Sequence, residues 1–343
     1  MSSPDPAGEP VIRPSRQQLR VSANQAPPLV DRNVVTDDAA LCEAVVRHGD
    51  ADVLDSLLPI GAEAGSGTAR EQGMLANEHH PELRPFDRFG TRIDEVEFHP
   101  SWHWLMERAV GHGLGAAAWQ AQEDGDPHAH VRRAAGFMAW SHTEPGHGCP
   151  ISMTYAAVPA LRLDDALGKE WVPRLASRIY DPGLRRPADK LGALAGMGMT
   201  EKQGGSDVRA NTTRAVQQAD GSYEIVGHKF FFSAPMCDAH LVLAQAEGGL
   251  SCFLLPRVLP DGALNAVRIQ RLKDKLGDWS NASSEVEFQG ATAHLVGAEG
   301  RGVPTIIEMV KLTRLDCMIG SSAQMRQALV QAVHHTSQRK AFG

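Results

Sequence analysis

A change in hydrophobic periodicity divides this chain into three parts and limits the folds that it can adopt. Between Thr36 and Leu194 the apolar residues recur mainly at helical spacing. The sequence then reads as strands and turns for about a hundred residues, and helical spacing returns after Gly302. This order predicts an α+β protein in which helical segments lie on both sides of one β domain in the sequence.

The predicted helices have recognisable local signals. Thr36 and the two aspartates after it are typical of a helix N-cap, and Leu41 and Val45 follow at helical spacing. Ser101 is predicted to cap a second helix that carries Leu105. The late helical segment has its apolar residues at Ile306, Met309, Val310, Met325, Leu329 and Val333.

The predicted β domain starts with a hairpin. Residues 212–216 and 223–227 read as two strands, and Asp220 with Gly221 between them is a favoured two-residue turn. Further strands are predicted at residues 241–244, 252–255 and 286–288, with a second turn at Gly248 and Gly249.

A glycine-rich run at the start of the β domain is the strongest candidate binding feature. Glycine lets the backbone approach a ligand closely, and successive amide N–H groups in such a turn form a concavity for anions. An aromatic run follows in a predicted strand, and its alternative interpretation is a buried strand of the β domain. The two runs consist of Met197, Gly198, Met199, Thr200, Glu201, Lys202, Gln203, Gly204, Gly205 and Ser206, and of Phe231, Phe232 and Ser233.

Together the two runs resemble the flavin-contacting segments of the acyl-CoA dehydrogenase family. The resemblance is closer to its AidB branch, the flavoproteins of the adaptive response to DNA alkylation. It extends from about Asp31 to Gly343 and includes motifs at residues 144–150, 272–277 and 313–316. It implies an N-terminal helical domain, a central β-barrel or sandwich domain that contacts FAD, and the start of a C-terminal helical bundle.

The resemblance also sets the expected domain boundaries. We expect a flexible N-terminal segment over residues 1–30, a helical domain over 31–195, a flavin-contacting β domain over 196–297 and the first part of the bundle over 298–343. In the AidB branch the bundle continues further, so roughly the last third of such a protein is expected to be absent. The apolar stripe of a partial bundle needs partners and should be poorly stabilised without them.

The family pattern assigns expected roles in holding FAD. Residues 197–206 would line the isoalloxazine ring, with Thr200 at the ring edge and Ser206 at the pyrophosphate. Residues 231–233 would cover the opposite region of the ring, where phenyl groups replace the indole of ordinary members. Arg339 matches the arginine that reaches the pyrophosphate of a neighbouring subunit, because a guanidinium donates two bonds to phosphate. Its alternative interpretation is a solvated arginine at the end of a basic helix.

No catalytic residue is predicted in this chain. Acyl-CoA dehydrogenation needs a carboxylate that removes the α-proton, and one family subgroup places this glutamate where this chain has Thr313. A threonine hydroxyl is too weakly basic for that role. The usual alternative glutamate lies far beyond Gly343. Arg314 and Asp316 are expected near the acyl pocket, or alternatively in a helix ion pair.

Three functional hypotheses remain open. The first is an FAD-binding AidB-like protein linked to the DNA alkylation response, with acyl-CoA dehydrogenase chemistry in its full-length form. The alternative is an ordinary acyl-CoA dehydrogenase that oxidises short or branched acyl-CoA and has no DNA role. A degenerate fragment is the third. The implied partners are an acyl-CoA-like small molecule, double-stranded DNA mainly through the absent C-terminal region, and further copies in a homotetramer when full length.

Composition excludes several other classes. The net charge of −7 gives no general reason for nucleic-acid binding, and the two basic pairs, 132–133 and 185–186, are predicted to be solvated. The five cysteines form no CxxC pair, which favours reduced thiols; Cys149 is interpreted as structural. His79, His80, His99 and His103 lack a completing ligand cluster, so no metal is predicted. No secretory signal and no apolar run of roughly 18 residues is present, which predicts a cytoplasmic protein without membrane contact.

Overall fold

The computed structural model describes residues 24–342. The expected flexible segment over residues 1–30 lies outside the described residues as far as residue 23. The described residues form two compact units. One comprises residues 30–324, and the other combines residues 24–29 with residues 325–342.

The helices before the sheet all belong to the unit of residues 30–324. They are α2 (Ala39–His48), α3 (Ala51–Ser56), α4 (Leu58–Ala64), α5 (Gly67–Glu78), α6 (Pro100–Gly111), α7 (Ala117–Glu123), α8 (Ala129–Trp140), α9 (Gly148–Leu161) and α10 (Asp165–Leu175). Helix α11 (Gly302–Gln338) follows the sheet. Within residues 24–342, every helix is too short or too polar to span a lipid bilayer.

The strands of the described residues form a hairpin and a larger sheet. The hairpin pairs β1 (Glu82–Phe86) with β2 (Arg92–Glu97). The seven-stranded sheet contains β3 (Ala195–Gly198), β4 (Arg214–Gln217), β5 (Tyr223–Ser233), β6 (Ala239–Ala246), β7 (Gly249–Pro256), β8 (Val267–Leu272) and β9 (Ser283–Leu295). Its order is β3-β6-β4-β5-β9-β7, and β7 also pairs with β6, so the sheet closes into a barrel-like ring. This confirms the predicted fold class.

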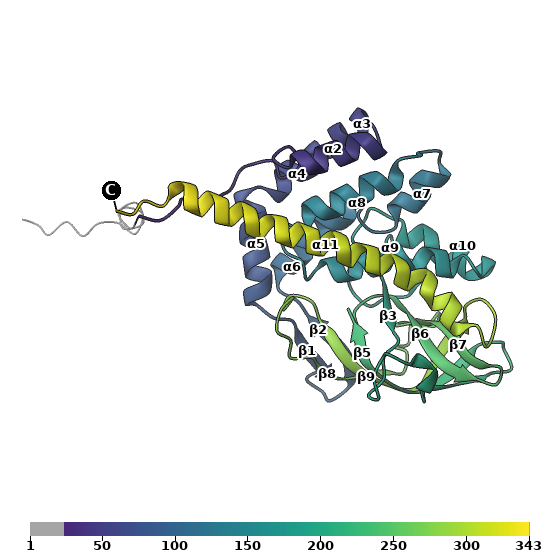
Figure 1. Cartoon of the computed structure of the whole chain (residues 1–343). Coiled ribbons are helices and arrows are strands. Elements are labelled where there is room, and N and C mark those ends of the chain that lie inside the picture. Colours follow the sequence, from purple (N-terminus) through teal and green to yellow (C-terminus); the bar gives the residue numbers. More distant parts are fainter. Residues whose placement is uncertain (1–23, 343) are drawn as a thin grey trace, which may run out of the picture. The chain divides into compact units, whose positions relative to one another are not determined.

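Helices and sheet occupy different sides of the unit of residues 30–324. Figure 1 shows α2 to α10 above the sheet, with the first half of α11 passing in front of them. Two large apolar clusters form the core, and one of them joins Leu161 of α9 and Leu241 of β6 to Met309 of α11. Helices and sheet therefore share one core, and the domain boundaries expected at residues 195 and 297 stay a prediction.

Local signals at the helix starts were partly correct. Asp38 caps α2, because its carboxylate accepts a hydrogen bond of 3.2 Å from the Leu41 amide. The predicted cap at Ser101 was wrong. Helix α6 starts at Pro100, and the ring of His99 accepts a bond of 3.2 Å from the Ser101 amide. Proline suits this first helical position because its φ is already helical and it has no N–H to satisfy.

Two strand predictions also needed correction. The β1–β2 hairpin lies inside the region that reads mainly as helical, although residues 95–98 alternate between exposed and buried as a strand does. The turn between β4 and β5 spans residues 218–222 instead of two residues. Gly221 has φ of +85° while Asp220 has a negative φ, and a two-residue type I′ turn requires a positive φ at both positions.

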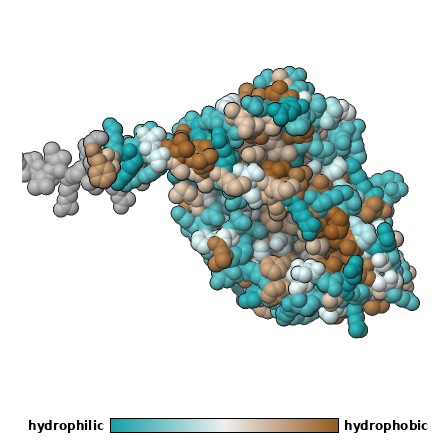
Figure 2. All heavy atoms as spheres, viewed as in Figure 1, coloured by the Kyte–Doolittle hydropathy of each residue, from teal (hydrophilic) through white to brown (hydrophobic). Residues whose placement is uncertain are grey.

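The apolar stripe of α11 is buried only in part. Ile306, Met309 and Val310 are buried, whereas Met325, Leu329 and Val333 are 67%, 56% and 58% exposed. Figure 2 shows apolar and polar residues mixed on the face along which the first half of α11 runs. The exposed stripe fits the expectation that a bundle helix needs further partners.

Candidate functional site

A cleft of about 470 Å³ lies between the helices and the sheet, within residues 30–324. It is bounded by α8 and α9, by β3 and β5, by the loop around Asn281 and by α11. Its lining residues are Phe137, Ser141, Pro145, Gly146, Gly148, Cys149, Ser152, Met153, Met197, Met199, Thr200, Phe231, Ser233, Asp278, Asn281, Thr313, Asp316, Cys317, Gly320, Ser321 and Gln324. A volume of this order suits a ligand of the size of a drug or a cofactor ring system.

The structure brings the two runs together at this cleft. Met197, Met199 and Thr200 of the glycine-rich run line it, and so do Phe231 and Ser233 of the aromatic run. The two segments meet because β3 pairs in parallel with β6, and the amide of Phe230 in β5 donates to the Thr200 carbonyl at 2.8 Å. Apolar side chains and hydroxyl groups therefore face the same space.

Glu201 of the glycine-rich run does not face the cleft. Its side chain is fully buried and forms an ion pair of 2.8 Å with Lys229, which is also fully buried. The Thr212 and Thr213 amides donate to the same carboxylate at 2.7 and 3.1 Å. Burial opposes its ionisation, but the Lys229 ammonium and these donors still lower the pKa of Glu201 below its ordinary value. The Glu201 side chain therefore fixes the loop instead of facing the cleft, and the predicted contact of this residue with the cofactor stays a prediction.

Phe232 also points away from the cleft, because side chains alternate between the two faces of a strand. Phe231 is 48% exposed and lines the cleft, while Phe232 is fully buried in the sheet. The Phe232 ring stacks on His240 with ring centroids 3.9 Å apart. The alternative interpretation as a buried strand is thus correct for Phe232 and incorrect for its neighbour. Phe231 also receives the Lys273 ammonium over its ring at 4.4 Å.

The rest of the glycine-rich run lies outside the cleft lining. Gly198 is buried beneath the Phe232 ring, and Gly204 has a positive φ of +114° that glycine adopts at little cost. The exposed residues of this loop are Lys202, Gln203, Gly205 and Ser206. Arg339 belongs to the unit of residues 24–29 and 325–342, where its guanidinium donates to the Asn24 carbonyl at 2.9 Å. The predicted contacts of Ser206 and Arg339 with a pyrophosphate stay predictions, as do those of the other residues of the run with the flavin ring.

Helix α11 contributes Thr313 and Asp316 to the cleft. The Thr313 hydroxyl donates to the Val310 carbonyl at 3.0 Å, so it is held within its own helix. Asp316 is 2% exposed and forms a buried ion pair with Arg133 of α8. Arg314 is exposed. Asp316 is thus ion-paired, although with a residue of another helix, and its expected place near an acyl pocket stays a prediction.

Residues 144–150 shape the cleft at the start of α9. Glu144 is 2% exposed and accepts bonds from the Gly146 and His147 amides at 2.7 and 2.9 Å, and from the His147 ring at 3.0 Å. These bonds hold the turn that brings Gly148 and Cys149 to the cleft. Burial raises the pKa of the Cys149 thiol to about 11, so the thiol stays protonated at neutral pH, which agrees with a structural role.

The histidines singled out by sequence have contacts of other kinds. The His79 and His99 rings stack at 4.4 Å, and the His103 ring is hydrogen-bonded to the Tyr180 hydroxyl at 2.8 Å. Over residues 24–342, no group of three or more His, Cys, Asp or Glu side chains is placed to hold a metal ion. The basic pairs 132–133 and 185–186 are ion-paired to Asp126, Asp316, Asp181 and Asp189.

Sequence reasoning missed several cleft residues. Phe137 and Met153 lie on helices, and their spacing gives no sign of which face meets the sheet. Three lining residues have a buried polar atom with no hydrogen-bond partner among the described residues: the Ser152 hydroxyl, the Asn281 side-chain carbonyl and one Asp316 oxygen. Such atoms are uncommon unless a water or ligand completes them. With the apolar wall, they fit a planar heterocycle that carries its own donors and acceptors, as a flavin ring does.

Comparisons with known proteins agree with this architecture. Residues 24–182 match the family described as adaptive response protein AidB N-terminal domain, and residues 196–291 match the acyl-CoA dehydrogenase middle domain. The solved structure of Caenorhabditis elegans ACDH-11 in complex with C11-CoA superposes with a TM-score of 0.82 at 29% identity, covering 93% of this chain and 55% of that one. The chain therefore belongs to the acyl-CoA dehydrogenase family.

Within that family the chain is similar to AidB proteins. It is 51% identical to AidB of Escherichia coli (strain K12) over 327 residues, which are 95% of this chain and 60% of that protein. It is 32% identical to acyl-CoA dehydrogenase family member 11 of Caenorhabditis elegans, covering 79% of this chain and 45% of that protein. The chain thus spans 60% or less of the length of these two relatives.

Proposed function

We propose that the cleft between β3, β5, α9 and α11 binds the isoalloxazine ring of FAD in an AidB-type member of the acyl-CoA dehydrogenase family. The observation that carries this proposal is that both candidate runs meet at one cleft, with Met197, Met199, Thr200, Phe231 and Ser233 in its lining. When bound, a flavin supplies a two-electron acceptor for oxidation of an organic substrate.

The residues of this chain have distinct parts in that proposal. Met197, Met199 and Phe231 would contact the faces of the ring and exclude water from it. The hydroxyl groups of Thr200 and Ser233 would donate to the polar edge of the ring. The exposed loop from Lys202 to Ser206 has room for the phosphate groups, and its backbone amides are suitable donors for an anion.

The proposed substrate of the whole protein is an acyl-CoA-like thioester. The relative solved in complex with C11-CoA supports this class of ligand. Neither of the two α11 residues named above is assigned as the base that removes the α-proton, because Thr313 is not basic and Asp316 is paired with Arg133. An ordinary acyl-CoA dehydrogenase without a DNA role is the alternative.

A role in the response to DNA alkylation is the second candidate function. It is favoured by the match of residues 24–182 to the AidB N-terminal domain family. The ion-paired arginines at 132–133 and 185–186 offer no free basic surface at those positions, so we propose that DNA contacts come mainly from a C-terminal region. A homotetrameric assembly in the cytoplasm is proposed for the full-length protein on the same family grounds.

The experiment is a titration of the purified protein with FAD, followed by flavin absorbance and fluorescence. We expect saturable binding, and Phe231→Ala should weaken it about fivefold to tenfold through loss of ring stacking. Phe89→Ala is the matched control, because Phe89 is 77% exposed and lies outside the cleft. A folded protein that stays colourless and ignores added FAD would contradict the proposal.

Two further assays separate the candidate functions. Anaerobic bleaching of the bound flavin by acyl-CoA would support thioester oxidation. Retardation of duplex DNA in a gel, weakening steeply as salt rises, would support DNA binding. Bleaching without retardation would favour the ordinary dehydrogenase.

A further inference from the structure

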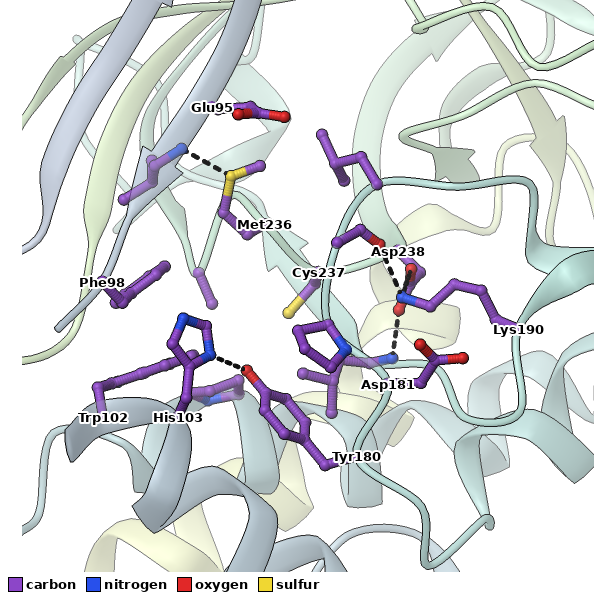
Figure 3. Close-up of a pocket in the computed structure, with 17 residues that line it drawn as sticks. Glu95, Phe98, Trp102, His103, Tyr180, Asp181, Lys190, Met236, Cys237 and Asp238 are labelled. Carbon is purple, nitrogen blue, oxygen red and sulfur yellow. Dashed lines mark hydrogen bonds and ion pairs between the residues drawn. The ribbon is translucent and has the colours of Figure 1, made fainter. Parts of the chain in front are cut away.

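A second cavity of about 190 Å³ lies between β2, α6 and the loops at residues 180–184 and 234–238 (Figure 3). It shares no lining residue with the cleft described above. Exposed residues at its rim, Glu95, Pro182 and Gly183, indicate that it opens to solvent between β2 and the first loop. The proposed flavin function makes no use of this cavity.

Most of the wall of this cavity is apolar and rigidly held. The rings of Phe98 and Trp102 stack with centroids 3.9 Å apart, and both residues are at least nine-tenths buried. Met236 is fixed opposite them, because its sulfur accepts a bond of 2.8 Å from the Val96 amide. Cys237 is 2% exposed, and burial raises the pKa of its thiol, so it is protonated at neutral pH. This wall suits an apolar ligand body.

The charged groups inside the cavity compensate one another. The Lys190 ammonium lies 2.5 Å from the Asp238 carboxylate and also donates to the Gly183 carbonyl at 3.1 Å. The other Asp238 oxygen accepts from the Leu194 amide at 2.8 Å. Figure 3 shows this pair at one end of the cavity, apart from the aromatic residues. Asp181 is paired with Arg185, and the remaining charged lining residue, Glu95, lies exposed at the rim. An ionic ligand inside the cavity would therefore meet no unpaired counter-charge, and burial of an unpaired charge is costly, so the interior favours a neutral molecule.

One polar group remains available on the aromatic side. His103 Nδ1 is hydrogen-bonded to the Tyr180 hydroxyl at 2.8 Å, and its second ring nitrogen faces the space bounded by Phe98, Met236 and Cys237 (Figure 3). Burial lowers the pKa of His103 and raises that of Tyr180, so both side chains are neutral at neutral pH. Among the residues that the structure describes, Nδ1 is the acceptor within reach of the Tyr180 O–H. We therefore assign this O–H as the donor, which places the hydrogen of the imidazole on Nε2.

A second donor in the wall has no partner. The indole N–H of Trp102 is buried and makes no hydrogen bond to any of the described residues. A buried donor without a partner is costly and is normally completed by water or ligand. Because the Trp102 nitrogen is itself buried, the Nε2 side of His103 is the polar group that the aromatic side of the cavity exposes.

We propose that this cavity binds a small neutral molecule with an apolar body and one carbonyl group, which accepts a hydrogen bond from Nε2 of His103. A cavity of roughly 150 Å³ holds benzene in another protein, so the volume here suits a benzene ring with a short substituent or an aliphatic chain of similar size. Ketones, esters and amides of this size share the required chemistry.

The experiment titrates the purified protein with two probes of almost the same shape, acetophenone and ethylbenzene, by isothermal titration calorimetry. Acetophenone should bind saturably and about tenfold more tightly than ethylbenzene, because only the ketone accepts the hydrogen bond. This comparison uses the unaltered protein, so it stands even where a variant fails to fold. Equal affinity for the two probes, or no binding of either, would overturn the proposal.

A variant assigns the effect to the cavity. His103→Phe keeps an aromatic ring in the wall and removes the hydrogen-bond donor. It should weaken the binding of acetophenone about tenfold and leave the affinity for ethylbenzene unchanged. His128→Phe is the matched control, since His128 is a surface residue outside the cavity lining. If acetophenone binds the His103→Phe variant as tightly as the wild type, His103 is not the donor to the carbonyl group.

Discussion

The replacement Lys229→Met tests how the glycine-rich run is held against the sheet. Lys229 and Glu201 are both fully buried, and the ammonium lies 2.8 Å from the carboxylate. Removing one partner of a buried ion pair typically costs about 3–5 kcal/mol of the free energy of unfolding. The Thr212 and Thr213 amides and the Thr212 hydroxyl would still donate to the carboxylate, so we expect the lower end, about 3 kcal/mol.

The sign of the pH dependence makes this test more specific. In the wild type the pKa of Glu201 lies below its ordinary value, so its contribution to stability is lost as pH falls. In the variant, no ammonium offsets the burial of the Glu201 carboxylate, so the pKa of this carboxyl should rise. Protonation at lower pH then removes the buried charge and the destabilisation that it causes. The difference in stability between the two proteins should therefore shrink as pH falls from about 7 to about 4.5.

Urea denaturation with linear extrapolation, at both pH values, measures these differences. Lys202→Met is the matched control. Lys202 belongs to the same run but is exposed, so its replacement should change stability by less than about 0.5 kcal/mol. A free energy of unfolding of Lys229→Met within about 1 kcal/mol of the wild-type value at neutral pH would refute this prediction, because the buried ion pair would then contribute little to stability.

Two further predictions concern buried residues that support the cleft from outside its lining. Gly198→Ala should destabilise the protein by about 1–3 kcal/mol, since a Cβ there lies 2.7 Å from the buried Phe232 ring; Gly111→Ala, with open space around it, should cost nothing in the same thermal unfolding assay. Burial opposes the charge of Glu144, but the hydrogen bonds from His147 and adjacent amides lower its pKa from 4.5 to about 2. Glu144 should therefore contribute about 3 kcal/mol at neutral pH, lost as pH falls from about 5 to 2, and Glu144→Gln should flatten that part of the curve of stability against pH. An unchanged slope in Glu144→Gln would contradict this.

Residue patterns predicted the class of fold because they report local preferences. Helical spacing, a cap within residues 36–38 and the strands predicted at residues 241–244 and 252–255 were correct, since period and caps depend on neighbours within a few positions. The β1–β2 hairpin was missed because its strands are short and it interrupts a long helical region. The five-residue turn after β4 was mistaken for a shorter one because Asp220 tolerates either sign of φ.

The sequence by itself determined that a glycine-rich run and an aromatic run would stand in the β part of an acyl-CoA dehydrogenase-like chain. Only the tertiary structure decided which of their side chains line the cleft. The pleat of β5 turns Phe231 to the cleft and Phe232 to the core, and the charge of Lys229 draws Glu201 beneath the loop. Likewise, Asp316 of α11 meets Arg133 of α8, and His103 of α6 meets Tyr180, across long separations in the chain. Such neighbours are set by the packing of helices on a sheet, which no local pattern specifies.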